Sequence, residues 1–179
     1  MFESFGMKRS SIGVMVAAMV VSGGLAAGPV QAGQAELDLL KSYVGSWRGS
    51  SVLVGGEKPE SFRCRLTVAP GTDAKIIYSG RCTLVNMNLS VAGTIAYNDA
   101  ARRYQAVMSS NVGFTGQAVG IKQGDRISFN LAEKQTDRGG NDVRIGSKIT
   151  LSNQTITVDF EVEFNNSGDI LTAKVPFSR

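Results

Sequence analysis

The chain has 179 residues, a formal net charge of +4 and no histidine. The absence of histidine excludes Ser-His-Asp and Cys-His catalysis, histidine metal sites and histidine-ligated haem. The excess of positive charge is mild and forms no dense basic stripe with aromatic readers, so nucleic acid is not an expected partner. Frequent glycine and scarce proline suit a β protein with many tight turns.

The first 32 residues have the pattern of a secretory signal peptide. Lys8 and Arg9 precede an apolar run over residues 12–21, which is too short to span a bilayer, and Val30-Gln31-Ala32 is a small-x-Ala cleavage site. We therefore predict a signal peptide over residues 1–32, one domain over 33–179 and a periplasmic or secreted protein. After cleavage no transmembrane span is expected, and an uncleaved N-terminal anchor is the alternative.

One short helix is expected before a long series of strands. Apolar residues from Leu37 to Val44 recur with helical spacing, and Gly45 ends the helix. Alternating runs then predict strands over residues 46–54, 60–69, 75–85, 88–97, 103–109, 113–122, 126–133, 142–151, 155–164 and 170–177.

Short links make these consecutive strands antiparallel neighbours, and closing the meander removes its two edges. The predicted fold is therefore all-β, an antiparallel up-and-down β-barrel of about ten strands with a short N-terminal helix. An open meander sheet or a sandwich is the alternative.

Two cysteines, Cys64 and Cys82, are expected to form a structural disulfide because the chain is predicted to be exported. Pairing Val68 with Tyr78 across the loop 70–74 puts the two cysteines opposite each other on the inner face. The bridge would close a loop of about 17 residues, worth about 3 kcal/mol in the chain-entropy model.

Charged residues on the outward faces also suggest a register. A turn at residues 153–154 pairs Lys148 with Asp159 and Arg144 with Glu163, and the next turn places Lys174 beside Asp159. Opposite charges on neighbouring strands suit an exposed barrel wall.

The disulfide hairpin carries a different pattern, because its register puts Arg65 opposite Arg81, with Arg63 nearby. Like charges that face each other are unfavourable unless an anion or an acidic partner lies over them. This arrangement predicts contact with an anionic envelope component, such as an acidic protein, a glycan or a lipid headgroup. A solvated basic face is the alternative.

The interior is expected to hold a void on the inner faces of the middle strands. Gly93 is predicted to face only Met108, which leaves space near Met108 that is lined by Val91, Ile95 and Phe114. The candidate ligand-binding residues are Gly93, Tyr97, Tyr104, Met108 and Phe114, with Tyr78 and Gln117 as further residues that face or rim the interior. No inward charge is assigned there, so the expected ligand is a small hydrophobic molecule.

Gly45-Ser46-Trp47, after a short helix and before a ten-strand meander, resembles the G-x-W signature of lipocalins and related calycins. In that family the tryptophan closes the base of the barrel under a basic residue from the last strand. The resemblance therefore implies a calycin-like β-barrel domain over residues 33–179, with Trp47 and Arg179 at its base and Lys174 as the second candidate.

Tyr97-Asn98-Asp99 followed by Arg103-Tyr104 resembles a hairpin of bacterial lipocalin-like domains of unknown function and of nitrobindin-like barrels. Nitrobindin-like proteins hold haem through a histidine, which this chain lacks, so no cofactor is expected.

Two functions remain open at this point. The first is an exported barrel that binds a small apolar or amphipathic ligand, and the second is an envelope structural or interaction protein with a filled barrel. An enzyme is not expected, because the sequence has no base of neutral pKa, no nucleophile elbow and no metal cluster. No catalytic residue and no metal site are predicted.

Overall fold

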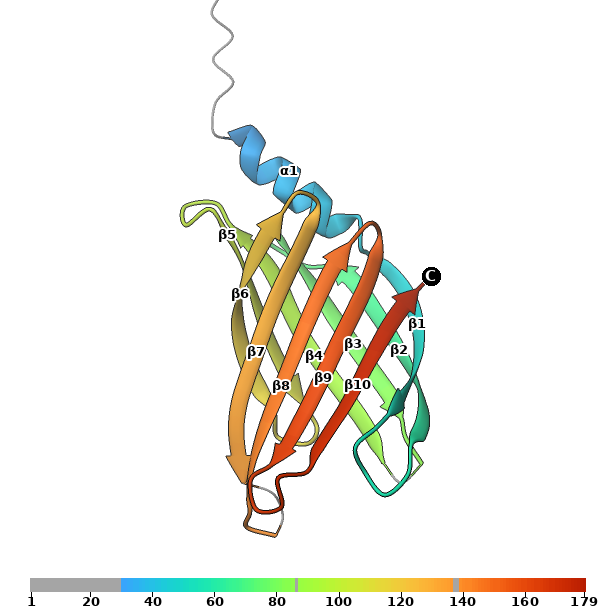
Figure 1. The fold of residues 1–179 in the computed structure, drawn as a ribbon. Coiled ribbons are helices and arrows are strands. Elements are labelled where there is room, and N and C mark those ends of the chain that lie inside the picture. The colour runs from blue at the N-terminus through green and yellow to red at the C-terminus, as the bar shows by residue number, and fades with distance from the viewer. Residues whose placement is uncertain (1–29, 86, 137–138) are drawn as a thin grey trace, which may run out of the picture.

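The computed structural model describes residues 30–85, 87–136 and 139–179 and consists of one helix and ten strands (Figure 1). Every strand predicted from the sequence is present, with ends that differ by at most a few residues. The elements are α1 (Val30–Lys41), β1 (Gly45–Leu53), β2 (Glu60–Pro70), β3 (Lys75–Thr83), β4 (Asn88–Asn98), β5 (Arg103–Ser110), β6 (Thr115–Gln123), β7 (Arg126–Thr136), β8 (Asp142–Ser152), β9 (Thr155–Phe164) and β10 (Ile170–Ser178).

The strands form a closed antiparallel barrel in sequence order, and β1 pairs with β10 to complete it. This confirms the up-and-down barrel and excludes the open sheet and the sandwich. The helix begins at Val30, so it includes the predicted cleavage site, whereas residues 1–29 of the predicted signal lie outside the described residues. No helix in the described part of the chain is long and apolar enough to cross a membrane.

The predicted registers are confirmed. Val68 pairs with Tyr78, and Cys64 lies opposite Cys82. On the other side of the barrel, β8 and β9 are joined by a two-residue turn at 153–154, in which both residues have positive φ. Such a turn matches the twist of the flanking strands.

That turn fixes the pairing of the charged residues on the outer wall. Lys148 lies opposite Asp159. Arg144 forms an ion pair with Glu163 at 2.7 Å, and Lys174 forms one with Asp159 at 3.5 Å.

Helix α1 covers one end of the barrel, at the top of Figure 1. The turns β2–β3, β4–β5, β6–β7 and β8–β9 lie at this capped end, and the loops β1–β2, β3–β4, β5–β6 and β9–β10 lie at the other end. Alternation along the strands turns the apolar side chains inward, and Trp47, Phe129 and Ile127 are almost completely buried among them.

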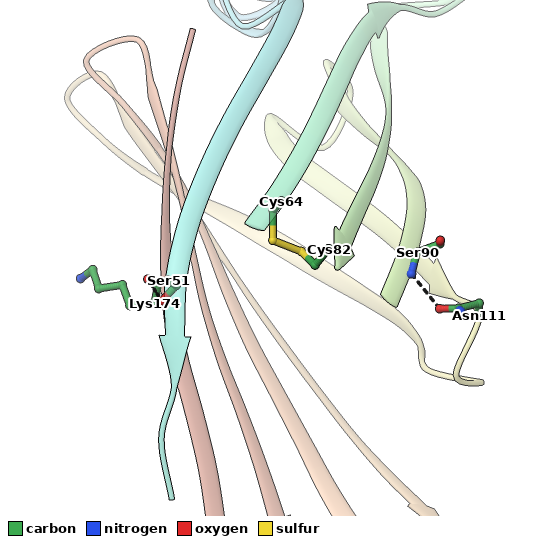
Figure 2. Close-up of a disulfide and its surroundings, with 6 residues drawn as sticks. All are labelled: Ser51, Cys64, Cys82, Ser90, Asn111 and Lys174. Atoms are coloured by element: carbon green, nitrogen blue, oxygen red, sulfur yellow. Dashed lines mark hydrogen bonds between the residues drawn. A yellow bond between two sulfur atoms is a disulfide. The ribbon is translucent and has the colours of Figure 1, made fainter. Parts of the chain in front are cut away.

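The seam between β1 and β10 is the least continuous part of the wall. Its ladder pairs Arg48 with Ser178 and Gly49 with Phe177, and resumes only at an isolated bridge between residues 54 and 172. Pro176 lies in the interval and has no N–H to donate. A side chain holds the seam instead, because Oγ of Ser51 donates a hydrogen bond to the carbonyl of residue 174 at 2.6 Å (Figure 2).

Candidate functional site

The interior of the barrel contains a cavity of about 360 Å³. This volume lies within the range of about 300–1,000 Å³ that is usual for small-molecule sites. The lining consists almost entirely of aliphatic and aromatic side chains from strands around the whole barrel, including Leu66, Ile76, Ile145, Val158, Phe160 and Val175. The barrel is therefore not filled, contrary to the expectation for a purely structural protein.

The cavity reaches solvent at the end of the barrel away from α1. Met87 and Val112, from the loops β3–β4 and β5–β6, line it and are both nearly half exposed. Val85, beside Met87, is 74% exposed. An apolar rim at the entrance keeps a hydrophobic ligand in contact with apolar surface as it enters.

Ser147, in the middle of β8, is the one residue in the buried part of the described chain whose side chain is neither aliphatic nor aromatic nor sulfur-containing. It is 7% exposed and lines the cavity. Its strand neighbours are Leu131 and Phe160, neither of which has a polar side chain. A ligand with one polar group would find its hydrogen-bonding partner here.

Tyr78 provides a second hydroxyl, from β3 on the opposite wall of the barrel. The hydroxyl donates a hydrogen bond to the carbonyl of Val107 at 3.3 Å. Burial raises the pKa of Tyr78. It therefore stays neutral at physiological pH, and the cavity gains no charge from it.

The space predicted near Met108 is present, because Met108, Val91, Ile95 and Phe114 line the cavity, but the expectation that Gly93 opens it is wrong. Gly93 does pair with Met108, but it also pairs with Tyr78 on its other side. The Tyr78 ring lies across the glycine, so that a Cβ there would be 2.5 Å from the Tyr78 hydroxyl and would also collide with the carbonyl of Val107. Gly93 makes room for Tyr78 and does not line the cavity.

The other four candidate residues divide between the two ends of the barrel interior. Met108 and Phe114 are buried and line the cavity, together with Val91 and Ile95. Tyr97 and Tyr104 lie at the capped end, where their rings meet edge to face at 5.1 Å. They lie outside the cavity lining. Gln117 points outward and is exposed.

Tyr104 belongs instead to a clamp that fixes α1 to the barrel. Its hydroxyl donates a hydrogen bond to the carboxylate of Glu36, and Nζ of Lys122 lies 2.6 Å from both carboxylate oxygens. Burial raises the pKa of Glu36, but the hydrogen bonds from Lys122 and Tyr104 outweigh this effect and lower it. Burial and the Glu36 carboxylate raise the pKa of Tyr104.

Trp47 and Arg179 form a second set of contacts, which closes the capped end of the barrel below the helix. Trp47 is 1% exposed, and its Nε1 donates a hydrogen bond to the carbonyl of Tyr43 at 2.9 Å. The guanidinium carbon of Arg179 lies 4.6 Å from the centroid of the Trp47 ring, which is a cation–π geometry. Arg179 also donates hydrogen bonds to the carbonyls of Ser42 and Val44, just after the end of α1.

The disulfide links β2 to β3 near the open end (Figure 2). Cys64 is buried and Cys82 is partly buried and lines the cavity. Further along the wall, the side chain of Asn111 accepts a hydrogen bond from the backbone N–H of Ser90 at 2.7 Å (Figure 2). These two links hold the rim in place where the loops begin.

Several of these residues have no signature in the sequence. Ser147 looks like any polar residue in an alternating strand, and the Glu36–Lys122 contact joins residues that are far apart in the chain. The signal for Ser147 is its place in the alternation of β8, because it lies two residues from Ile145 and two from Ile149 and so shares their inward face.

Searches against family models and curated proteins find no match. Solved structures do show the same fold. The crystal structure of Rv2717c from M. tuberculosis matches with a TM-score of 0.57 and 17% sequence identity, covering 80% of this chain and 98% of that one. The S-type phycobiliprotein lyase CPES from Guillardia theta matches with a TM-score of 0.50 and 15% identity, covering 80% and 94%. At these identities the likeness concerns the fold alone, a closed antiparallel β-barrel.

Proposed function

We propose that the protein is an exported, non-enzymatic carrier of a small apolar or amphipathic molecule. The observation that carries this proposal is the cavity, which is apolar, closed at one end by Trp47 and α1, and open at the other through an apolar rim. The disulfide suits an oxidising compartment, the periplasm or the extracellular space.

The chemistry of the lining supports the proposal of binding without catalysis. The lining residues with ionisable side chains are Tyr43, Tyr78, Arg65 and Arg81, and the two arginines point outward from β2 and β3, so only the tyrosine side chains face the cavity. Burial raises the pKa of both tyrosines, so neither supplies a base at neutral pH. The lining can therefore desolvate a hydrophobe, but it offers no group of suitable pKa for acid–base chemistry.

The test is uptake of N-phenyl-1-naphthylamine, a neutral probe whose fluorescence rises in an apolar environment. Val162 lines the cavity on β9, and its neighbour Glu161 points outward and is exposed. We expect Val162→Trp to abolish uptake and Glu161→Trp to bind the probe as the wild type does. Val162→Trp is expected to fold, because filling an existing space avoids the usual cost of overpacking, about 1–3 kcal/mol. Glu161→Trp is expected to fold because its side chain lies outside the barrel.

Native mass spectrometry of protein purified from its own host completes the test, and a co-purifying apolar molecule is the expected result. If the wild type takes up no probe and carries no such molecule, the carrier proposal fails. Equal loss of uptake in both tryptophan variants would also count against it, because it would place the probe outside the barrel.

The polar group of the ligand is expected to meet Ser147. Ser147→Ala should lower the affinity for decanol about fivefold, the effect of one lost hydrogen bond. The affinity for decane, which has no polar group, should not fall. A parallel change for both compounds would show that Ser147 contributes only shape.

A further inference from the structure

The outer wall formed by β1–β4 carries positive charge without compensation. Arg48 pairs with Arg65, and Arg65 pairs with Arg81, so three arginines stand in one row across three neighbouring strands. All three are exposed, and we call this row the arginine ladder. Arg63 lies on the same face, one step nearer the open end.

No acidic side chain balances this ladder. Across β1–β4 the one acidic residue is Glu60, at the rim, where its carboxylate accepts a hydrogen bond from the backbone N–H of Val85. None of the ladder arginines forms an ion pair or a hydrogen bond within the described residues. Like charges directly opposite on neighbouring strands are destabilising, so the row is unfavourable for the isolated barrel.

The opposite wall shows that this chain does pair its charges elsewhere. On β8–β10, Arg144 and Lys174 each form an ion pair with an acidic residue of β9. The contrast between the two walls indicates that the ladder is a site for an external anion. Arginine suits that role, because its planar guanidinium binds carboxylate or phosphate oxygens in a bidentate manner.

An open groove continues from the ladder across the wall. It has a volume of about 530 Å³, begins at Arg65 and Arg81, and crosses β4 to β5. The polar side chains on the outer face of this groove are those of Thr67, Ser79, Ser90, Ser109 and Asn111. Ala92 pairs with Ser79 and with Ser109, and its small side chain keeps this part of the groove shallow.

We propose that the arginine ladder and this groove bind an anionic glycan, with acidic groups on the arginines and sugar hydroxyls over the serines and threonines. Neighbouring strands are about 4.8 Å apart, so the ladder spans about 10 Å, more than one isolated anion covers. No aromatic side chain points outward from β1–β4, so the wall offers no platform for stacking nucleic-acid bases. The site lies outside the barrel and is independent of the cavity ligand.

The experiment measures binding of a short oligogalacturonate by calorimetry at about 0.15 M salt. Its methyl-esterified form, which has the same sugar and no charge, is the ligand control. Arg65→Gln/Arg81→Gln should weaken binding about tenfold or more, because charge-assisted hydrogen bonds are lost. The control variant Arg103→Gln/Lys134→Gln changes the net charge equally, away from the ladder, and should stay within about twofold of the wild type.

The thermal midpoint distinguishes a lost site from a lost fold. Removing two facing arginines relieves repulsion, so the ladder variant should melt no lower than the wild type. Equal weakening in both double variants would reduce the effect to net charge and overturn the proposal. Tighter binding of single-stranded DNA than of the oligogalacturonate, or equal binding of the methyl ester, would overturn it as well.

Discussion

Removal of the Trp47 ring tests how the capped end of the barrel is held. In Trp47→Ala a side chain that is 1% exposed leaves a cavity, which typically costs about 3–5 kcal/mol. The carbonyl of Tyr43 also loses its donor, which places the effect toward the upper end of that range. For a domain of this size 1 kcal/mol corresponds to about 2–4 °C, so the midpoint of unfolding should fall by about 6–20 °C.

The contribution of Arg179 is separable from that of the ring. A cation over an aromatic ring contributes about 0.5–2 kcal/mol, depending on its desolvation. Arg179→Gln should therefore lose stability in that range, and the loss should shrink when Trp47 is already alanine, because the two changes remove the same contact. Trp47→Phe retains an aromatic ring but has no N–H, so it isolates the hydrogen bond to Tyr43.

Thermal unfolding of the mature protein, followed by far-ultraviolet circular dichroism, gives the midpoints of the wild type and the four variants. A midpoint of Trp47→Ala within one or two degrees of the wild type would refute the argument, because a buried indole cannot be removed without cost. Additive losses in the double variant would refute the stacking of Arg179 while leaving the burial of Trp47 intact.

Three further predictions concern the clamp, the disulfide and the arginine ladder. The pKa of the Glu36 carboxyl is lowered in the folded state, so the stability that the ionised carboxylate adds is present above the pKa of the unfolded chain and is lost as the pH falls through the folded-state pKa. Acid titration should therefore lower the stability of Glu36→Gln less than that of the wild type. Identical stability curves for the two proteins would contradict the clamp. Alkylation of unreduced, denatured protein should modify neither Cys64 nor Cys82, and replacing both with serine should cost about 3 kcal/mol by urea unfolding. Arg65→Glu should raise stability by about 0.2–1 kcal/mol for each new pair, such as that with Arg81, and should abolish oligogalacturonate binding; a lower midpoint would argue against the repulsion.

Local rules explain why the sequence predicted the barrel wall so closely. A tight turn fixes the register of its two strands, and alternation then decides which side chains face inward. The opposition of Cys64 and Cys82, and that of Lys148 and Asp159, each depends on one short connection. The same turn-based register paired Arg65 with Arg81. It did not predict the pairing of Arg48 with Arg65, because the longer β1–β2 loop does not fix the register of those two strands.

The interior was harder to predict, because it depends on where side chains extend beyond their Cβ atoms. Gly93 was correctly paired with Met108, but the ring that fills the space comes from Tyr78 on the other neighbouring strand. Tyr97 and Tyr104 lie outside the cavity lining for a similar reason, since α1 folds over that end and Glu36 accepts a hydrogen bond from the Tyr104 hydroxyl. A helix packed on the end of a barrel leaves no periodic signal in the strands beneath it.

The seam between β1 and β10 has a consequence for local opening of the barrel. Only two ladder pairs and one bridge join these strands, over an interval that contains Pro176, whereas the other strands are joined through tight turns or loops between chain neighbours. Local opening requires few broken hydrogen bonds there, so amide protons of β1 and β10 should exchange faster than those of β8 and β9. The strands farthest apart in the chain must also meet last, after a large loss of loop entropy, so closing this seam should be the slow step in folding.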